Sequence, residues 1–118
     1  MIGLDRLMRI SGVIAAGQFS PNGKVIRSFG SLPKEVMAFT ARMCANQTKT
    51  LNTSVEQYSK ATQLDWTPLT GWAAWGRKYA VVVVGNTGVF VDPRHADFNQ
   101  LVTDLMGSET TEARQMNY

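Results

Sequence analysis

The hydrophobic pattern of this chain includes one apolar run, residues 79–84, that contains four consecutive valines. Valine side chains are stiff at χ1 and fit a pleated strand better than a helix. Side chains of a strand point to alternate faces, which gives two apolar sets: Tyr79, Val81 and Val83 on one face, and Ala80, Val82 and Val84 on the other. We therefore expect this strand in the middle of a sheet that is covered on both sides.

The start of the chain predicts a short helix and a hairpin. The helix is expected over residues 3–10, before Ser11-Gly12, and a strand is expected over Val13–Phe19. The small residues at 15–17 indicate that another element packs closely over this strand. Residues 20–23, Ser-Pro-Asn-Gly, form a turn signal, and residues 24–29 return as an outer strand.

A long helix is predicted to open at residues 30–33, where a proline near the start is well placed. Apolar or small positions then recur at spacings of four and three, which is a heptad-like seam of about six turns. These positions are Met37, Ala41, Cys44, Thr48, Leu51, Val55 and Tyr58, with Val36, Phe39 and Met43 widening the seam near its start. Because periodicity gives no direction, the seam is either the core face of the subunit or partly a contact with a second copy.

The second half of the chain predicts a linker, three strands and a helix. The linker covers residues 60–68, and the strands cover residues 69–75, 79–85 and 89–92, with turns at 76–78 and 86–88. A final helix over residues 94–106 is expected to end at Gly107. The expected organisation is a single domain over residues 1–106 and a flexible polar tail over residues 107–118.

This order of elements resembles the roadblock superfamily, and more specifically a bacterial family of uncharacterised roadblock-like proteins. The segments that carry the resemblance are residues 10–19, 21–24, 43–44, 71–72 and 85–91. The resemblance implies a profilin-like α+β fold, an α/β sandwich in which a five-stranded antiparallel sheet of order 2-1-5-4-3 has helices on both faces. It also implies homodimers that form through the third strand and the long helix.

The implied dimer interface combines the helix seam with the third strand. Its residues are Met37, Ala41, Cys44, Thr48, Leu51, Val55, Leu69, Gly71, Trp72, Ala73 and Trp75. The sequence supports this interface, because a strand with two tryptophans and no charge is a poor solitary edge, and pairing with its own copy gives a twofold dimer. Trp72 and Trp75 are expected on opposite faces of the strand. Arg77 and Lys78 form either a solvated turn or a basic corner for an acidic partner.

The composition of the chain limits the classes of function that we expect. The chain has 118 residues, 44% hydrophobic and 18% charged, which are values of a globular domain. Its net charge of +3 is spread out, so we expect no DNA or RNA partner. A single cysteine, no signal peptide and no apolar stretch of about 20 residues predict a cytoplasmic protein without a membrane segment.

Candidate chemistry is sparse. Cys44 is either a reactive thiol or a buried small hydrophobe on the seam. His95 is either a lone acid or base beside Asp92 or Asp97, or a surface histidine at a helix start. One histidine without companion ligands predicts no metal site, and no glycine-rich phosphate loop follows a strand. We therefore expect no cofactor and no enzymatic activity.

The favoured hypothesis is a non-enzymatic, homodimeric protein-interaction or scaffold module. The resemblance implies a small GTPase, or a sulfur-oxidation complex of the heterodisulfide-reductase-like type, as its partner. An alternative is a sensor or carrier whose small molecule binds between sheet and helix, over the small residues at 15–17. A third hypothesis is an enzyme that uses Cys44 or His95.

Overall fold

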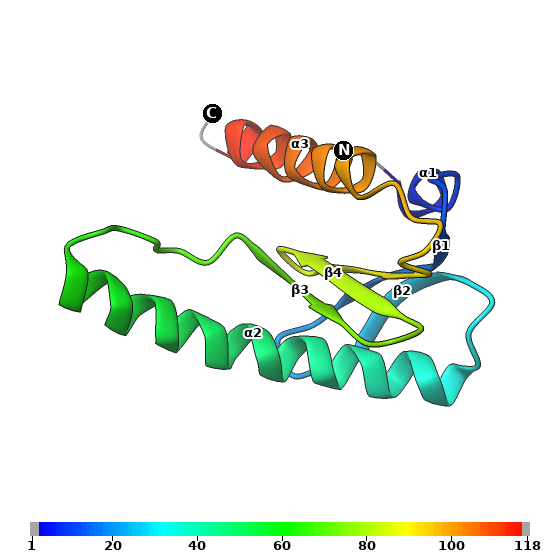
Figure 1. Cartoon of the computed structure of the whole chain (residues 1–118), viewed down its shortest axis with the longest axis horizontal. Coiled ribbons are helices and arrows are strands. Elements are labelled where there is room, and N and C mark those ends of the chain that lie inside the picture. The colour runs from blue at the N-terminus through cyan, green and yellow to red at the C-terminus, as the bar shows by residue number, and fades with distance from the viewer. Residues whose placement is uncertain (1–2, 117–118) are drawn as a thin grey trace.

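A computed structural model of the chain describes residues 3–116, and the expectations at residues 1–2 and 117–118 lie outside it (Figure 1). The elements are α1 Leu4–Leu7, β1 Val13–Phe19, β2 Val25–Gly30, α2 Lys34–Thr62, β3 Gly71–Trp75, β4 Ala80–Val84, β5 Thr87–Val91 and α3 Phe98–Met116. The strands form one antiparallel sheet of order β2-β1-β5-β4-β3. The predicted α+β fold and its sheet order are confirmed.

Strand β4 is buried along its whole length because helices cover both faces of the sheet. Helix α2 lies on one face, and α1 and α3 lie on the other (Figure 1). Val81 and Val83 belong to the α2-side core, whereas Val82 and Val84 belong to the core with Leu101 of α3. The predicted alternation along this strand is therefore confirmed.

The hairpins differ from prediction at two places. Gly85 and Asn86 alone form the turn between β4 and β5, with Gly85 at φ 60°, so β5 begins at Thr87. A two-residue hairpin turn requires such positive φ values, which glycine adopts without strain. In β2, a bulge leaves Ile26 unpaired, because Val25 pairs with Phe19. The bulge turns Val25 toward the α2 face of the sheet.

Four helix boundaries were predicted wrongly. Helix α1 ends at Leu7, and helix α2 continues to Thr62. The next residue, Gln63, adopts the left-handed conformation, and its N–H donates a hydrogen bond to Ser59 O. Helix α3 starts at Phe98 and continues through Gly107 to Met116. Glycine inside a helix costs only about 1 kcal/mol, which neighbouring helix formers offset. Within residues 3–116, none of the helices has the length and apolar character needed to cross a membrane.

Helix α2 is much longer than the sheet that it covers. Its 29 residues span about 43 Å, whereas a five-residue strand spans roughly 17 Å. The end of the helix therefore projects beyond β3, and the chain returns to the sheet through residues 63–70 (Figure 1). We call residues 52–70 the arm. Trp66 N donates to Ser59 Oγ at 2.8 Å and Leu69 N to Asn52 Oδ1 at 3.3 Å, which ties the returning segment to α2.

Candidate protein interaction surface

Strand β3 has an open edge. It pairs with β4 alone, and within residues 3–116 no strand lies along its other side. Gly71 and Trp72 are half-buried, whereas Ala73, Ala74 and Trp75 are exposed. Leu69, which was predicted inside this strand, precedes it. Because the strand is uncharged and its backbone groups are free to pair, its edge can accept another strand.

The two tryptophans of β3 point to opposite faces, as predicted. Trp72 packs against the α2-side core, and its Nε1 donates a hydrogen bond of 2.8 Å to Thr48 Oγ1. Trp75 lies on the other face, where its ring centroid is 4.6 Å from that of Phe98 in α3. Trp75 remains 57% exposed. Of the two rings, Trp75 therefore offers more surface to a partner.

The seam of α2 faces its own sheet at its centre. Ala41 and Cys44 are buried against Phe19 and Val83 within the subunit, and their assignment to a contact with a second copy stays a prediction. Thr48 is bonded to Trp72. The remaining predicted interface positions on α2 are half-buried, and these are Met37, Leu51 and Val55. The core interpretation of the seam thus holds where the helix lies over the sheet.

Three apolar side chains that were expected to widen this seam point away from the core. Val36, Phe39 and Met43 are exposed on the first half of α2, and Phe39 is 67% exposed. The Arg42 guanidinium carbon lies 4.5 Å from the centroid of the Phe39 ring. The sequence placed these residues on the helix but could not give the direction of the apolar face. They form an exposed apolar stripe, which is a feature of interaction surfaces.

The arm carries a second group of exposed apolar side chains. Tyr58 and Trp66 make an edge-to-face contact with centroids 5.9 Å apart, and Trp66 is 60% exposed. Leu64 is exposed between them in the chain. Asp65 Oδ1 accepts hydrogen bonds from Thr67 Oγ1 and Thr67 N at 2.8 and 3.0 Å, which lower the pKa of Asp65. Sequence reasoning assigned Trp66 to a linker and missed this packed end of α2.

Arg77 and Lys78 lie in the turn between β3 and β4. Both are exposed, and neither forms an ion pair with any residue that the structure describes. The turn is closed by Gly76 N, which donates to Tyr79 O at 2.8 Å. Both cations therefore stand at the end of the open β3 edge, where they remain candidates for contact with an acidic partner.

The environment of Cys44 opposes a reactive role. The side chain is 1% exposed, and desolvation by burial raises the pKa of its thiol to about 11. The nucleophilic form of cysteine is the thiolate, which this environment disfavours at neutral pH. Cys44 therefore has the geometry of a small core residue.

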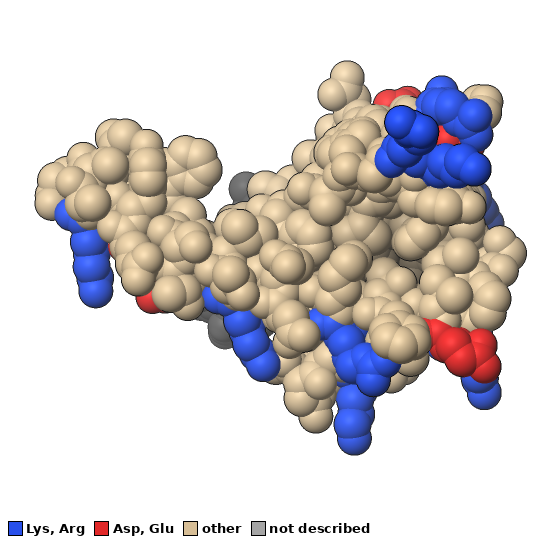
Figure 2. All heavy atoms as spheres, turned by 60° about the horizontal axis from the view of Figure 1, so that its bottom comes forward, with Lys and Arg blue, Asp and Glu red and all other residues tan. Residues whose placement is uncertain are grey.

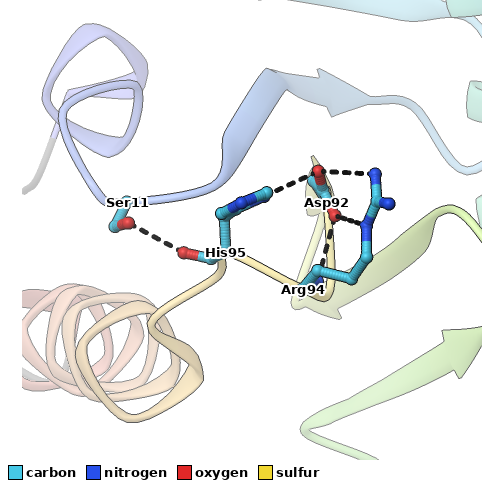
Figure 3. Close-up of polar contacts among 4 residues, drawn as sticks. All are labelled: Ser11, Asp92, Arg94 and His95. Carbon is cyan, nitrogen blue, oxygen red and sulfur yellow. Dashed lines mark hydrogen bonds and ion pairs between the residues drawn. The ribbon is translucent and has the colours of Figure 1, made fainter.

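His95 belongs to a polar cluster at the junction of β5 and α3 (Figure 3). Its Nδ1 lies 3.0 Å from Asp92 Oδ2, and Arg94 Nε lies 3.3 Å from Asp92 Oδ1. The hydrogen bond with His95 and then those with Arg94 lower the pKa of Asp92 to about 2. Ser11 Oγ donates to His95 O at 2.7 Å, so its hydroxyl supports the loop. The His95 side chain is 70% exposed.

This cluster has the form of a structural junction. It joins the loop before β1 to the loop before α3, where Asp97 N also donates to Ser11 O at 3.1 Å. Gly12, at φ 83°, lets the two loops meet, since a Cβ there would lie 2.5 Å from Ala96 Cα. Within residues 3–116, no three acidic, histidine or cysteine side chains come together in a way that could hold a metal ion.

An apolar cavity lies between β1, β5 and α2, where the small-molecule hypothesis placed a pocket. Its lining includes Ala15, Gly17, Cys44 and Phe90, and its volume is about 40 Å³. Pockets for small ligands have volumes of roughly 300–1,000 Å³. The cavity is therefore much too small for a metabolite in this structure.

The sheet order and the long covering helix define a roadblock-like α+β fold. A family model described as "Uncharacterized conserved protein (DUF2173)" matches residues 3–107. The chain therefore belongs to this family. No curated protein sequence matches it significantly.

Solved structures share this fold at low sequence identity. A Roadblock/LC7 domain from Streptomyces avermitilis has a TM-score of 0.76 at 13% identity, covering 96% of this chain and 94% of that one. Gliding protein MglB from Thermus thermophilus has a TM-score of 0.69 at 16% identity, with coverages of 93% and 81%. Myxococcus xanthus MglB has a TM-score of 0.62 at 18% identity, with coverages of 96% and 89%. At these identities the likeness concerns the fold.

Proposed function

We propose that this protein is a non-enzymatic interaction module that works as a homodimer, with β3 paired to β3 of a second copy. The observation that carries the proposal is the open edge of β3, whose exposed Ala73, Ala74 and Trp75 include no charge or proline. Proteins usually block such an edge, because it would otherwise pair with another chain. A second copy covers it by the same kind of hydrogen bonding that already joins β3 to β4.

The arm supports the same arrangement. It reaches beyond β3, and Figure 2 shows it as a lobe that projects from the body of the molecule. A paired strand lies only about 4.8 Å from its neighbour, so a second copy on the β3 edge comes beneath this lobe. The exposed rings of Tyr58 and Trp66 are then positioned to pack on the partner. Aromatic side chains of this kind dominate the energetics of protein interfaces.

The dimer would in turn present surfaces to another protein. The exposed stripe of Val36, Phe39 and Met43 lies on α2, away from the β3 edge. Arg77 and Lys78 add a basic corner beside the dimer interface. A small GTPase and a sulfur-oxidation complex both remain predictions from the family resemblance. The burial of Cys44, which raises the pKa of its thiol, supports a role without thiol catalysis.

A charge substitution on β3 tests the dimer. Ala73 is the middle residue of β3, so in a twofold antiparallel pair it lies close to its own copy. We expect Ala73→Glu and Ala73→Lys each to give a folded monomer in sedimentation equilibrium, because like charges then face each other. Mixing the two variants should restore the dimer, because a glutamate of one copy then faces a lysine of the other.

The matched control is Ile26→Glu, which adds the same charge to the other edge strand of the sheet. It should leave the dimer intact. The β3 edge is not the interface if the wild-type protein is a monomer in sedimentation equilibrium. The same conclusion follows if the Ala73→Glu protein dimerises as tightly as wild type.

A further inference from the structure

The opposite edge of the sheet carries a groove between β2 and the first turns of α2. Its volume is about 750 Å³, and its walls include Val25 and Ser28 from the strand and Lys34, Ala38 and Arg42 from the helix. The three helix residues are spaced by four, so they lie on one face of α2. Ala38, the smallest of them, stands in the middle and leaves the groove open there.

Two local features shape this groove. The β2 bulge turns Val25 toward α2, as described above. The hairpin tip rests on α2, because Gly23 at φ 83° would place a Cβ only 3.0 Å from Arg42 Cα. The tip therefore closes one end of the groove, and its neighbour Lys24 adds a positive charge to the lining there.

The groove also lies next to the inner apolar cavity. Val25, Ser28, Leu32 and Met37 line both spaces. An apolar side chain that enters the groove therefore contacts residues that also belong to the lining of this cavity. Strand β2 is exposed along its whole length, and within residues 3–116 no strand pairs with its outer edge. This edge can accept an extended segment.

The charges of the groove favour one kind of occupant. Its lining includes the cations Lys24, Lys34 and Arg42 but only one acid, Glu35. None of the three cations forms an ion pair with a residue in the described chain. Figure 2 shows basic side chains along the α2 side of the molecule, with few acidic ones among them. An acidic segment is therefore complementary to this surface.

We propose that this groove binds an extended acidic segment of another protein, which pairs with β2 and inserts one apolar side chain beside Ala38. Lys34 and Arg42 are eight residues apart on α2, which is about 12 Å along its axis. An extended chain covers this distance in about four residues, and residues four apart point to the same side. The preferred pattern is thus acidic, any, apolar, any, acidic.

Selection from a phage-displayed library of random dodecapeptides, on the full-length protein at low ionic strength, tests the proposal. Enriched peptides should show the acidic–apolar–acidic pattern. A fluorescent synthetic copy of the most enriched peptide should bind the Lys34→Glu/Arg42→Glu variant about tenfold or more weakly, and added salt should weaken wild-type binding. Ala38→Tyr, which fills the centre of the groove on an exposed helix position, should also abolish binding.

Lys49→Glu provides the control, because Lys49 is exposed on the same helix but does not line the groove. It should leave peptide affinity unchanged. Neutral or basic enriched peptides, or equal losses with Lys49→Glu, would overturn the proposal. A loss of peptide binding in the Ala73→Glu variant would also overturn the proposal, because the peptide would then occupy the β3 edge. A changed oligomeric mass of Lys34→Glu/Arg42→Glu would instead assign the groove to a second copy.

Discussion

Trp72 Nε1 donates a hydrogen bond of 2.8 Å to Thr48 Oγ1, which ties edge strand β3 to the middle of helix α2. These two elements contribute most of the surface that we assign to the dimer. The indole N–H is a donor that needs a partner when it is removed from water. The hydrogen bond therefore fixes the position of β3 relative to the arm before a second copy binds, which lowers the ordering cost of association.

The first prediction concerns this bond. Thr48→Val keeps the shape of the side chain but leaves the Trp72 N–H without its acceptor. We expect the free energy of unfolding to fall by about 1–2 kcal/mol, measured by urea denaturation. Thr50→Val is the control, because Thr50 is exposed and its hydroxyl donates to Asn46 O within its own helix. Equal effects of the two substitutions would contradict a structural role for the Trp72–Thr48 bond.

The sequence predicted the direction of side chains best in the strands, because successive residues of a strand always point to opposite faces. Alternation in β4 gave the faces of Val81 and Val82 correctly, and the spacing in β3 separated Trp72 from Trp75. The sheet order came from the family resemblance, and the structure has the same order. The two alternation patterns depend on local geometry that a strand cannot vary much.

The helix surfaces were less predictable. The seam of α2 has the right period, but only tertiary packing decides that Cys44 faces inward and Phe39 faces solvent. The end of α2 depends on Gln63 in a left-handed conformation, for which glycine would have been the usual sequence signal. The groove has Val25 and Ala38 in its lining, and the β2 bulge that turns Val25 toward α2 has no sequence signature.

The second prediction concerns the arm. Trp66→Ser removes a ring whose described aromatic contact is with Tyr58, so the monomer fold should persist. We expect the dimer to weaken by about 2 kcal/mol, roughly thirtyfold in Kd, in sedimentation equilibrium, as for a central aromatic anchor. Phe39→Ser, which removes another exposed ring from the other end of α2, should leave the Kd unchanged. An unchanged Kd for Trp66→Ser would exclude the arm from the interface.

The third prediction concerns Cys44. Burial raises the pKa of its thiol from 9.0 to about 11, so the native state keeps a proton that the unfolded state loses. The resulting stabilisation is fully present below pH 9 and is lost as the pH rises through about 11. The difference in unfolding free energy between wild type and Cys44→Ala should shrink over this interval. Native iodoacetamide labelling at neutral pH should be slow and should accelerate in urea, whereas rapid native labelling would revive the reactive-thiol interpretation.

The fourth prediction concerns the junction between β5 and α3. The hydrogen bonds from His95 and Arg94 lower the pKa of Asp92 from 3.8 to about 2, which means that the native state favours the carboxylate. The unfolded state takes up the proton first as the pH falls. Asp92 therefore stabilises the fold fully above about pH 4, and this contribution is lost as the pH approaches 2.

Asp92→Asn should consequently flatten the fall in melting temperature between pH 4 and pH 2, while lowering the melting temperature at pH 7. Asp5→Asn is the control, because it removes one negative charge from an exposed position on α1, outside the cluster. Only the Asp92 variant should also loosen the link between the loops that Ser11 and His95 join. Hydrogen exchange at the Asp97 amide, which donates to Ser11 O, reports on that link. Unchanged exchange in Asp92→Asn would show that the loops hold together without the carboxylate.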